Sequence, residues 1–282
     1  MMLRNVVKLG CSRWGLLAAL LWVQSPALSH ELFLKPERFV LPPNSKQTLT
    51  VVNGTFDQSL AIFARSRMRE VSILADGQLR HPPDSDWHDA SAASHLRFDT
   101  GTGGTYLAGV SSRSGVRTQT ADDFRSFLKL YGALDGLEAY EKDGAMPSVR
   151  LRSSKHVKAV VQVGSNYSAD FGKQLGHPVE IVLERNPYRL KLGDSLDFQV
   201  LHQGQPVAGH WVYASHAGHN EDDNAPKRVN AQKLRTDSQG RASVTLGKHA
   251  PWYIALIHVH RVSDGVADFE ATWATLSFEL RP

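Results

Sequence analysis

Residues 177–214 read HPVEIVLERNPYRLKLGDSLDFQVLHQGQPVAGHWVYA. Short runs rich in apolar and β-branched residues alternate here with Gly, Pro, Asn and Asp, a pattern that predicts strands joined by turns. The same pattern continues to the C-terminal end, giving runs at 179–184, 195–202, 210–215, 233–236, 242–246, 252–261 and 272–280. Seven short antiparallel strands over about 100 residues are typical of an immunoglobulin-like sandwich.

The preceding part of the chain also has the pattern of short strands. Its β-rich runs lie at 31–39, 46–53, 59–63, 68–75, 95–98, 105–111 and 157–163. Asp76 and Gly77 stand between two such runs, and an Asp-Gly pair in that position predicts a β-hairpin. This part of the chain is therefore predicted to form strands as well.

One interval, residues 120–141, has helical instead of strand periodicity. Phe124, Phe127, Leu128 and Tyr131 recur at the spacing of one helix face, and Thr120 is a suitable N-cap. Gly132 and Gly136 are expected to divide the interval into two short helices.

The pattern changes between Gly172 and Gly176, where we place a domain boundary. We therefore predict a mainly β protein of two β-rich domains. The first covers residues 30–172 and carries the helical insertion at about 120–141. The second covers residues 177–282 and forms the immunoglobulin-like sandwich.

Residues 1–29 have the three parts of a secretory signal peptide: a basic start, an apolar core at 14–23, and small residues before a cut after Ser29. We predict that this segment is removed, that the mature chain begins at His30, and that the protein is periplasmic. The single cysteine, Cys11, lies in the segment, so the mature chain has no disulfide and no thiolate metal site. No later stretch is long and apolar enough for a membrane helix.

The composition excludes some classes of function. Once the predicted signal peptide is removed, acidic and basic residues nearly balance and no basic stripe is interleaved with aromatic residues, so we expect no nucleic-acid partner. The sequence has no G-x-S-x-G elbow, no P-loop and no H-E-x-x-H motif, so we do not predict an enzyme. The chain does contain 13 histidines, all outside residues 1–29.

His30 is the first candidate metal ligand. A cut after Ser29 would give it a free α-amino group, which together with the imidazole Nδ1 can close a chelate ring on one metal ion. Nitrogen ligands of this kind suit Ni, Co, Cu or Zn better than Ca or Mg.

His258 and His260 are the second and third candidates, in the run IALIHVHR at 254–261. Residues two apart on a strand point to the same face, so both imidazoles can face one site. The histidines that stand alone in the sequence are not predicted to be ligands: His156, His177, His202, His210 and His249.

Several motifs occur in a fixed order along the chain. The stretch at 30–36 reads HELFLKP, and 177–214 contains H-P-V-E, N-P-Y, L-x-x-G-D-x-L and G-x-P-V-x-G-x-x-V. These stretches resemble the DUF4198 family of exported bacterial proteins, which is related to periplasmic components of nickel and cobalt uptake systems. Phe33 stands where the family opening usually has Trp. The similarity continues at 122–137, 155–164, 236–246, 252–261 and 267–280.

The resemblance implies two β-rich domains, the second sandwich-like, and a role in binding or delivering a transition ion in the periplasm. It places His30 and His258 at positions that match the family. Members that work in uptake often carry a membrane anchor near one end. This sequence shows none, so we expect a free periplasmic binder, with a membrane uptake system as a candidate partner.

Three functions are open at this point. The favoured one is a periplasmic protein that binds Ni, Co, Cu or Zn, with His30 and His258 as ligands and His260 as a third ligand or an outer partner. The second is a metal-free module that binds a carbohydrate or a protein. The third is a copper oxidase that uses a histidine chelate.

Overall fold

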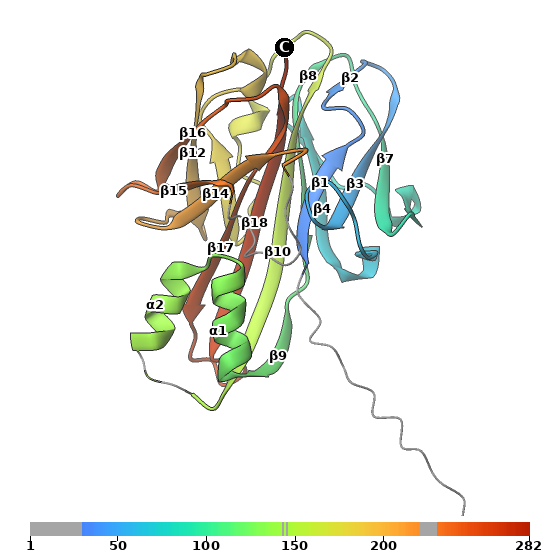
Figure 1. The fold of residues 1–282 in the computed structure, drawn as a ribbon. Helices are drawn as coiled ribbons and strands as arrows, with labels where there is room; N and C mark the ends of the chain where they lie inside the picture. Colours follow the sequence, from blue (N-terminus) through green and yellow to red (C-terminus); the bar gives the residue numbers. More distant parts are fainter. Residues whose placement is uncertain (1–29, 143, 145, 220–229) are drawn as a thin grey trace, which may run out of the picture.

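The computed structural model describes residues 30–142, 144, 146–219 and 230–282 (Figure 1). The predicted signal peptide lies outside the described residues. The strands are β1 (Glu31–Pro36), β2 (Val40–Leu41), β3 (Lys46–Gly54), β4 (Met68–Ala75), β5 (Gln78–Arg80), β6 (Trp87–Ala90), β7 (Ala93–Asp99), β8 (Gly104–Ser112), β9 (Gly115–Thr120), β10 (Ser148–Val163), β11 (Val179–Leu183), β12 (Ser195–His202), β13 (Gln205–Pro206), β14 (Trp211–His216), β15 (Gln232–Arg235), β16 (Arg241–Thr245), β17 (Ala250–Arg261) and β18 (Phe269–Leu280). The α-helices are α1 (Ala121–Leu130) and α2 (Leu134–Lys142), and short 3-10 helices lie at Arg65–Arg67, Asp84–Asp86, Asp170–Gly172 and Pro187–Arg189. None of the helices in these ranges is long and apolar enough to cross a membrane.

A ten-stranded sheet forms the middle of the fold, and we call it the central sheet. Its main order is β15-β14-β17-β18-β10-β8-β4-β5, and β2 and β9 also pair with β10. The long strands β10 and β18 pair in parallel, from Leu151 beside Phe269 to Ala159 beside Ser277. The centre of the sheet is therefore built from strands that are far apart in the sequence.

Two smaller sheets cover opposite faces of the central sheet. The N-terminal sheet has the order β1-β3-β7-β6, and the C-terminal sheet contains β11, β12, β13 and β16. Alternation along β10 explains the two cores, because successive side chains of a strand point to opposite faces. Val161 packs in the core under the N-terminal sheet, whereas its neighbour Val160 packs in the core under the C-terminal sheet.

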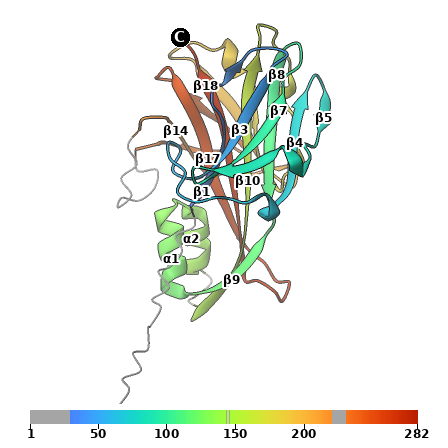
Figure 2. The same ribbon diagram turned by 90° about the vertical axis from the view of Figure 1, so that its right-hand side faces the viewer.

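The helices α1 and α2 lie beside the end of the central sheet where β9 runs, as both views show (Figures 1 and 2). The hydroxyl of Thr120 accepts a hydrogen bond from the Asp123 amide at 3.1 Å, which confirms the predicted N-cap. Gly132 ends α1 with a positive φ of 66°. Gly136 lies inside α2, so the prediction that it breaks the helix is wrong. An added Cβ there would lie 2.7 Å from Val259 Cβ, so the glycine allows α2 to approach β17.

The fold-class prediction is confirmed: the protein is mainly β, with sandwich-like packing and a short helical insertion. The predicted hairpin at Asp76 and Gly77 is also present, joining β4 to β5. Two other expectations were inaccurate. Residues 59–63 form only an isolated bridge, from Ser59 to Gly54, and β10 begins at Ser148 instead of near residue 157.

Strands from both sides of the predicted domain boundary join the central sheet. β10 precedes the boundary and β18 follows it, yet they pair along much of their length. The domain boundary between Gly172 and Gly176 therefore stays a prediction, and in the described structure one sheet contains strands from both sides of it.

Candidate metal site

The candidate site lies where an apolar stripe on β17 ends. Trp252, Ile254 and Leu256 point into the core between the central and C-terminal sheets. Residues two apart share a face of a strand, so His258 and His260 continue this stripe. The interior of the sandwich therefore changes from apolar to imidazole at the C-terminal end of β17.

The stripes of two other strands end in the same way. On β12, Phe198 and Val200 pack in the core, and His202 takes the next position on that face. On β14, the stripe containing Val212 is preceded by His210, which stands just before the strand. Histidines from three separate segments thus lie at one end of the sandwich.

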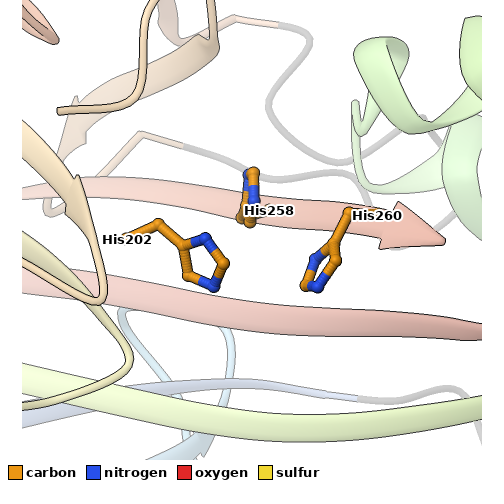
Figure 3. A group of neighbouring side chains, drawn as sticks. All are labelled: His202, His258 and His260. Atoms are coloured by element: carbon orange, nitrogen blue, oxygen red, sulfur yellow. The ribbon is translucent and has the colours of Figure 1, made fainter. Parts of the chain in front are cut away.

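His202, His258 and His260 face one another in Figure 3. Each offers one ligand atom, and these three atoms all lie within 4.8 Å of one another. The ring centroids are 4.6 Å apart for His202 and His258, and 5.2 Å apart for each of the other two pairs. All three side chains are only partly buried, so an ion could reach the cluster from solvent. We call these three residues the histidine cluster.

Each ring of the cluster has a buried nitrogen that forms no hydrogen bond in the described structure. These atoms are Nε2 of His202, Nδ1 of His258 and Nδ1 of His260. Buried polar atoms are nearly always hydrogen-bonded in folded proteins, and each exception asks for an explanation such as an ion. Three exceptions in one cluster are the feature expected of a metal site.

His210 stands next to the cluster, with its ring centroid 5.4 Å from that of His258. Its Nδ1 lies 2.9 Å from the Asp135 carboxylate on α2, and its Nε2 is buried with no hydrogen-bond partner among the described residues. Asp135 also accepts a hydrogen bond from the Trp211 amide at 3.1 Å. Burial would raise the pKa of Asp135, but these hydrogen bonds lower it below its usual value. Asp135 therefore stays ionised and fixes the orientation of His210.

A second carboxylate lies on the other side of the cluster. Glu270 on β18 pairs in register with His260, and its Oε2 is 3.1 Å from Nη1 of Arg152. It acts electrostatically on His202. The cluster therefore has an acidic residue near each end, which favours a bound cation.

Two imidazoles of the cluster, those of His258 and His202, have a pKa below the usual value for histidine. Burial lowers the pKa of His258 to about 3, and the neighbouring His210, His202 and His260 act in the same direction. Burial and His260 also lower the pKa of His202. Only a neutral imidazole has a lone pair free for a metal, so these two rings are ready to bind one at neutral pH.

His30 lies on the other face of the central sheet. The Lys155 ammonium donates a hydrogen bond to the His30 carbonyl oxygen and lies 5.2 Å from the centre of the Trp273 ring. Trp273 and Ile257 pack with the helices, on the face away from His258. The structure thus brings together His258 and His260, and it does not bring His30 to them. Metal chelation by a mature N-terminal His30 stays a prediction.

His202 and His210 are the residues that sequence reasoning missed. Each stands alone in the sequence, and its neighbours in space come from other strands. A signal was nevertheless present, because His202 continues the alternating apolar run of β12 and His210 precedes that of β14 with the same alternation. A histidine at the end of such a run belongs at the rim of the core, where it can meet others.

Comparison with solved structures gave matches of low identity. Salmonella α-2-macroglobulin reacted with methylamine is 13% identical with a TM-score of 0.23, covering 88% of this chain and 15% of that chain. Escherichia coli α-2-macroglobulin activated by porcine elastase is 13% identical with a TM-score of 0.25, covering 90% and 20%. The D0-D1 domain of intimin is 11% identical with a TM-score of 0.20, covering 87% and 97%. The chain thus spans a fifth or less of these two α-2-macroglobulin chains.

No curated protein matches the sequence. The model of the DUF4198 family, described as a domain of unknown function, matches residues 27–260. The match includes all three residues of the histidine cluster, together with Asp135 and His210. Because it spans most of the sequence, the chain belongs to the DUF4198 family.

Proposed function

We propose that this protein binds a transition-metal ion through His202, His258 and His260. The observation that carries the proposal is the convergence of three imidazoles, each with a buried nitrogen that has no hydrogen-bond partner among the described residues. An ion bound by one nitrogen of each ring would hold the three imidazoles together.

The chemistry of the ligands limits the choice of ion to Ni, Co, Cu or Zn, because imidazole suits these metals whereas Ca and Mg prefer oxygen. Nitrogens around a tetrahedral ion lie ~2.1 Å from it, and hence roughly 3.4 Å from one another. The ligand atoms of the cluster lie within 4.8 Å, so a small inward movement of the rings is enough.

Three protein ligands leave a further position on the ion open. The open position and the partial exposure of the rings allow an ion to be exchanged, which suits binding and transfer better than a purely structural role. We further propose that residues 1–29 direct the protein to the periplasm and that it hands its ion to a membrane uptake system. The signal-like sequence and the family resemblance support these two points.

The test is a calorimetric titration of Ni, Co, Cu and Zn into protein that carries no affinity tag and has been stripped with a chelator. We expect one ion per chain, and we expect His258→Ala and His202→Ala each to weaken binding by more than the roughly 10–100-fold typical of losing an outer partner. His249→Ala is the matched control, because His249 is exposed and outside the cluster. Failure of the unaltered protein to bind any of the four metals, or equal binding by His258→Ala and His249→Ala, would overturn the proposal.

A further inference from the structure

A cavity of about 700 Å³ opens on the face of the central sheet opposite the histidine cluster. Its walls come from the residue before β1, the end of β3, the turn before β4, the end of β8 with the start of β9, and β10. Four cationic residues line it: Arg67, Arg113, Arg117 and Lys155. We call it the cationic cavity.

Positive charge in the cationic cavity is not balanced by local ion pairs. None of the described residues that line it is acidic. In the described part of the chain, no carboxylate lies within ion-pair distance of any of the four cationic side chains. The nearest acidic influence is the buried Glu31 on β1, which acts electrostatically on Lys155. One carboxylate beside four cations leaves a net positive cavity.

Backbone groups and aromatic rings hold the arginines where they are. The Arg113 amide donates to the Arg67 carbonyl at 2.9 Å, and Nε of Arg113 donates to the Ser66 carbonyl at 3.1 Å. These bonds tie the β8–β9 connection to the turn before β4. The Arg67 guanidinium stacks 4.3 Å from the centre of the Phe63 ring. The positive groups are thus gathered without a carboxylate to neutralise them.

Two features of the described cationic residues are unfavourable without a bound anion. The Nε atom of Arg117 is buried and forms no hydrogen bond in the described structure. Burial lowers the pKa of Lys155 to about 7, and Arg67 and Arg117 act in the same direction against the opposing effect of Glu31. Burying a polar donor without a partner and crowding like charges both cost free energy. A negatively charged ligand would remove both costs.

We propose that the cationic cavity binds a small organic anion carrying two or more carboxylate or phosphate groups. Guanidinium groups present a planar fork of donors that matches the two oxygens of either group. Ser66, Ser114 and Ser153 also line the cavity, and serine hydroxyls can donate to the remaining oxygens. The volume lies within the range of about 300–1,000 Å³ that is usual for small-ligand sites.

The size of the site favours a compact ligand over a polymer. All four cations line one cavity of about 700 Å³, whereas a nucleic-acid strand needs a groove that tracks its backbone. The proposal does not depend on the metal site, because the two sites share no residues and lie on opposite faces of the central sheet.

The test is calorimetric titration of two probes, tricarballylate and inorganic pyrophosphate, into the metal-free protein at low ionic strength. We expect saturable binding of at least one probe, and the preferred probe distinguishes a carboxylate ligand from a phosphate ligand. Arg117→Gln is expected to weaken binding at least tenfold, whereas Arg117→Lys keeps the charge and loses less. Arg80→Gln is the matched control, since Arg80 is an exposed arginine on β5 that does not line the cavity.

Correct folding of each variant is checked by its circular dichroism spectrum and by its urea unfolding curve. A well-folded Arg117→Gln protein that binds both probes as strongly as Arg80→Gln would overturn the proposal. So would the absence of saturable binding of either probe by the unaltered protein. Either result would leave the metal-site proposal untouched, because that proposal is judged by the metal titration alone.

Discussion

Lys155 and His258 lie in neighbouring cross-strand rows of the central sheet and point to opposite faces of it. Thr272 of β18 pairs with His258, and the next residue, Trp273, pairs with Lys155. Because successive side chains of a strand alternate between faces, the histidine cluster and the cationic cavity lie back to back with one sheet between them. Substitutions on one face can therefore be used as controls for the other.

Asp135→Asn is expected to weaken metal binding. The Asp135 carboxylate orients His210 beside the cluster and supplies negative charge, and the amide of asparagine keeps the shape but loses the charge. Loss of an outer partner of this kind typically lowers metal affinity by about 10–100-fold. Asp122→Asn, an exposed change on α1, is the control. If the two variants titrate alike, Asp135 and His210 have no part in binding.

Adding one alanine before His30 is expected to leave metal binding at the histidine cluster unchanged. The reason is position, since His30 lies on the face of the central sheet away from His258. The measurement compares protein that begins at His30 with the extended form, each with and without His258→Ala. Binding that survives His258→Ala but disappears on extension would instead assign the site to the His30 chelate.

The buried pair His156 and His177 is expected to make the protein less stable in weak acid. Their rings lie 5.5 Å apart, and burial lowers the pKa of each to about 3. Each also lies near positive charge, from Arg69 in both cases and from Lys158 in the case of His177. Between the unfolded value of 6.5 and about 3, the unfolded chain holds more protons than the folded one, so stability falls as pH falls.

From pH 7 to pH 5 this loss amounts to about 2 kcal/mol for each histidine. His177→Gln removes one titrating group, so its free energy of unfolding should depend less steeply on pH in this range. Urea unfolding at several pH values measures the slope, with His249→Gln as the exposed control. Equal slopes for the two variants would show that His177 takes up its proton in the folded state as easily as in the unfolded state.

Lys158→Met is expected to destabilise the protein by about 3–5 kcal/mol, because it leaves a buried carboxylate without its cation. Nζ of Lys158 lies 2.8 Å from Glu180, and both side chains are almost fully buried. Glu180 also accepts hydrogen bonds from the amides of Leu175, Gly176 and His177. The double variant Lys158→Met with Glu180→Gln should be more stable than the single one, as measured by chemical unfolding. A single variant as stable as the unaltered protein would show that the pair contributes little.

The fold class could be predicted because apolar alternation and turn residues mark most strands directly. β10 was placed too late because its first half, around Arg152 and Ser154, is polar and half-buried, so it gives no apolar run. The parallel pairing of β10 with β18 had no local signal at all. This pairing depends on long-range packing, because both faces of the two strands are covered by other parts of the chain.

The candidate site could also be predicted in part from local sequence. His258 and His260 stand two apart on one strand, and strand geometry alone places them on one face. His202 joins them only through packing of the C-terminal sheet on the central sheet. The chemistry of its side chain and amine makes His30 a candidate ligand as well. Its distance from the cluster depends on the order of the strands in the central sheet, which a single sequence does not reveal.

The position of β18 in the central sheet affects how the chain folds. This strand follows all the others in chain order, yet it lies between β10 and β17, and it brings together residues such as Arg150 and Asp268 that are 118 positions apart. Such long-range pairing gives the fold a high contact order, and folding of this kind is slow. Without β18, β10 and β17 would each have an unpaired edge that invites aggregation. His258 pairs with Thr272 of β18 and Lys155 pairs with Trp273, so the histidine cluster and the cationic cavity both depend on the pairing of this strand.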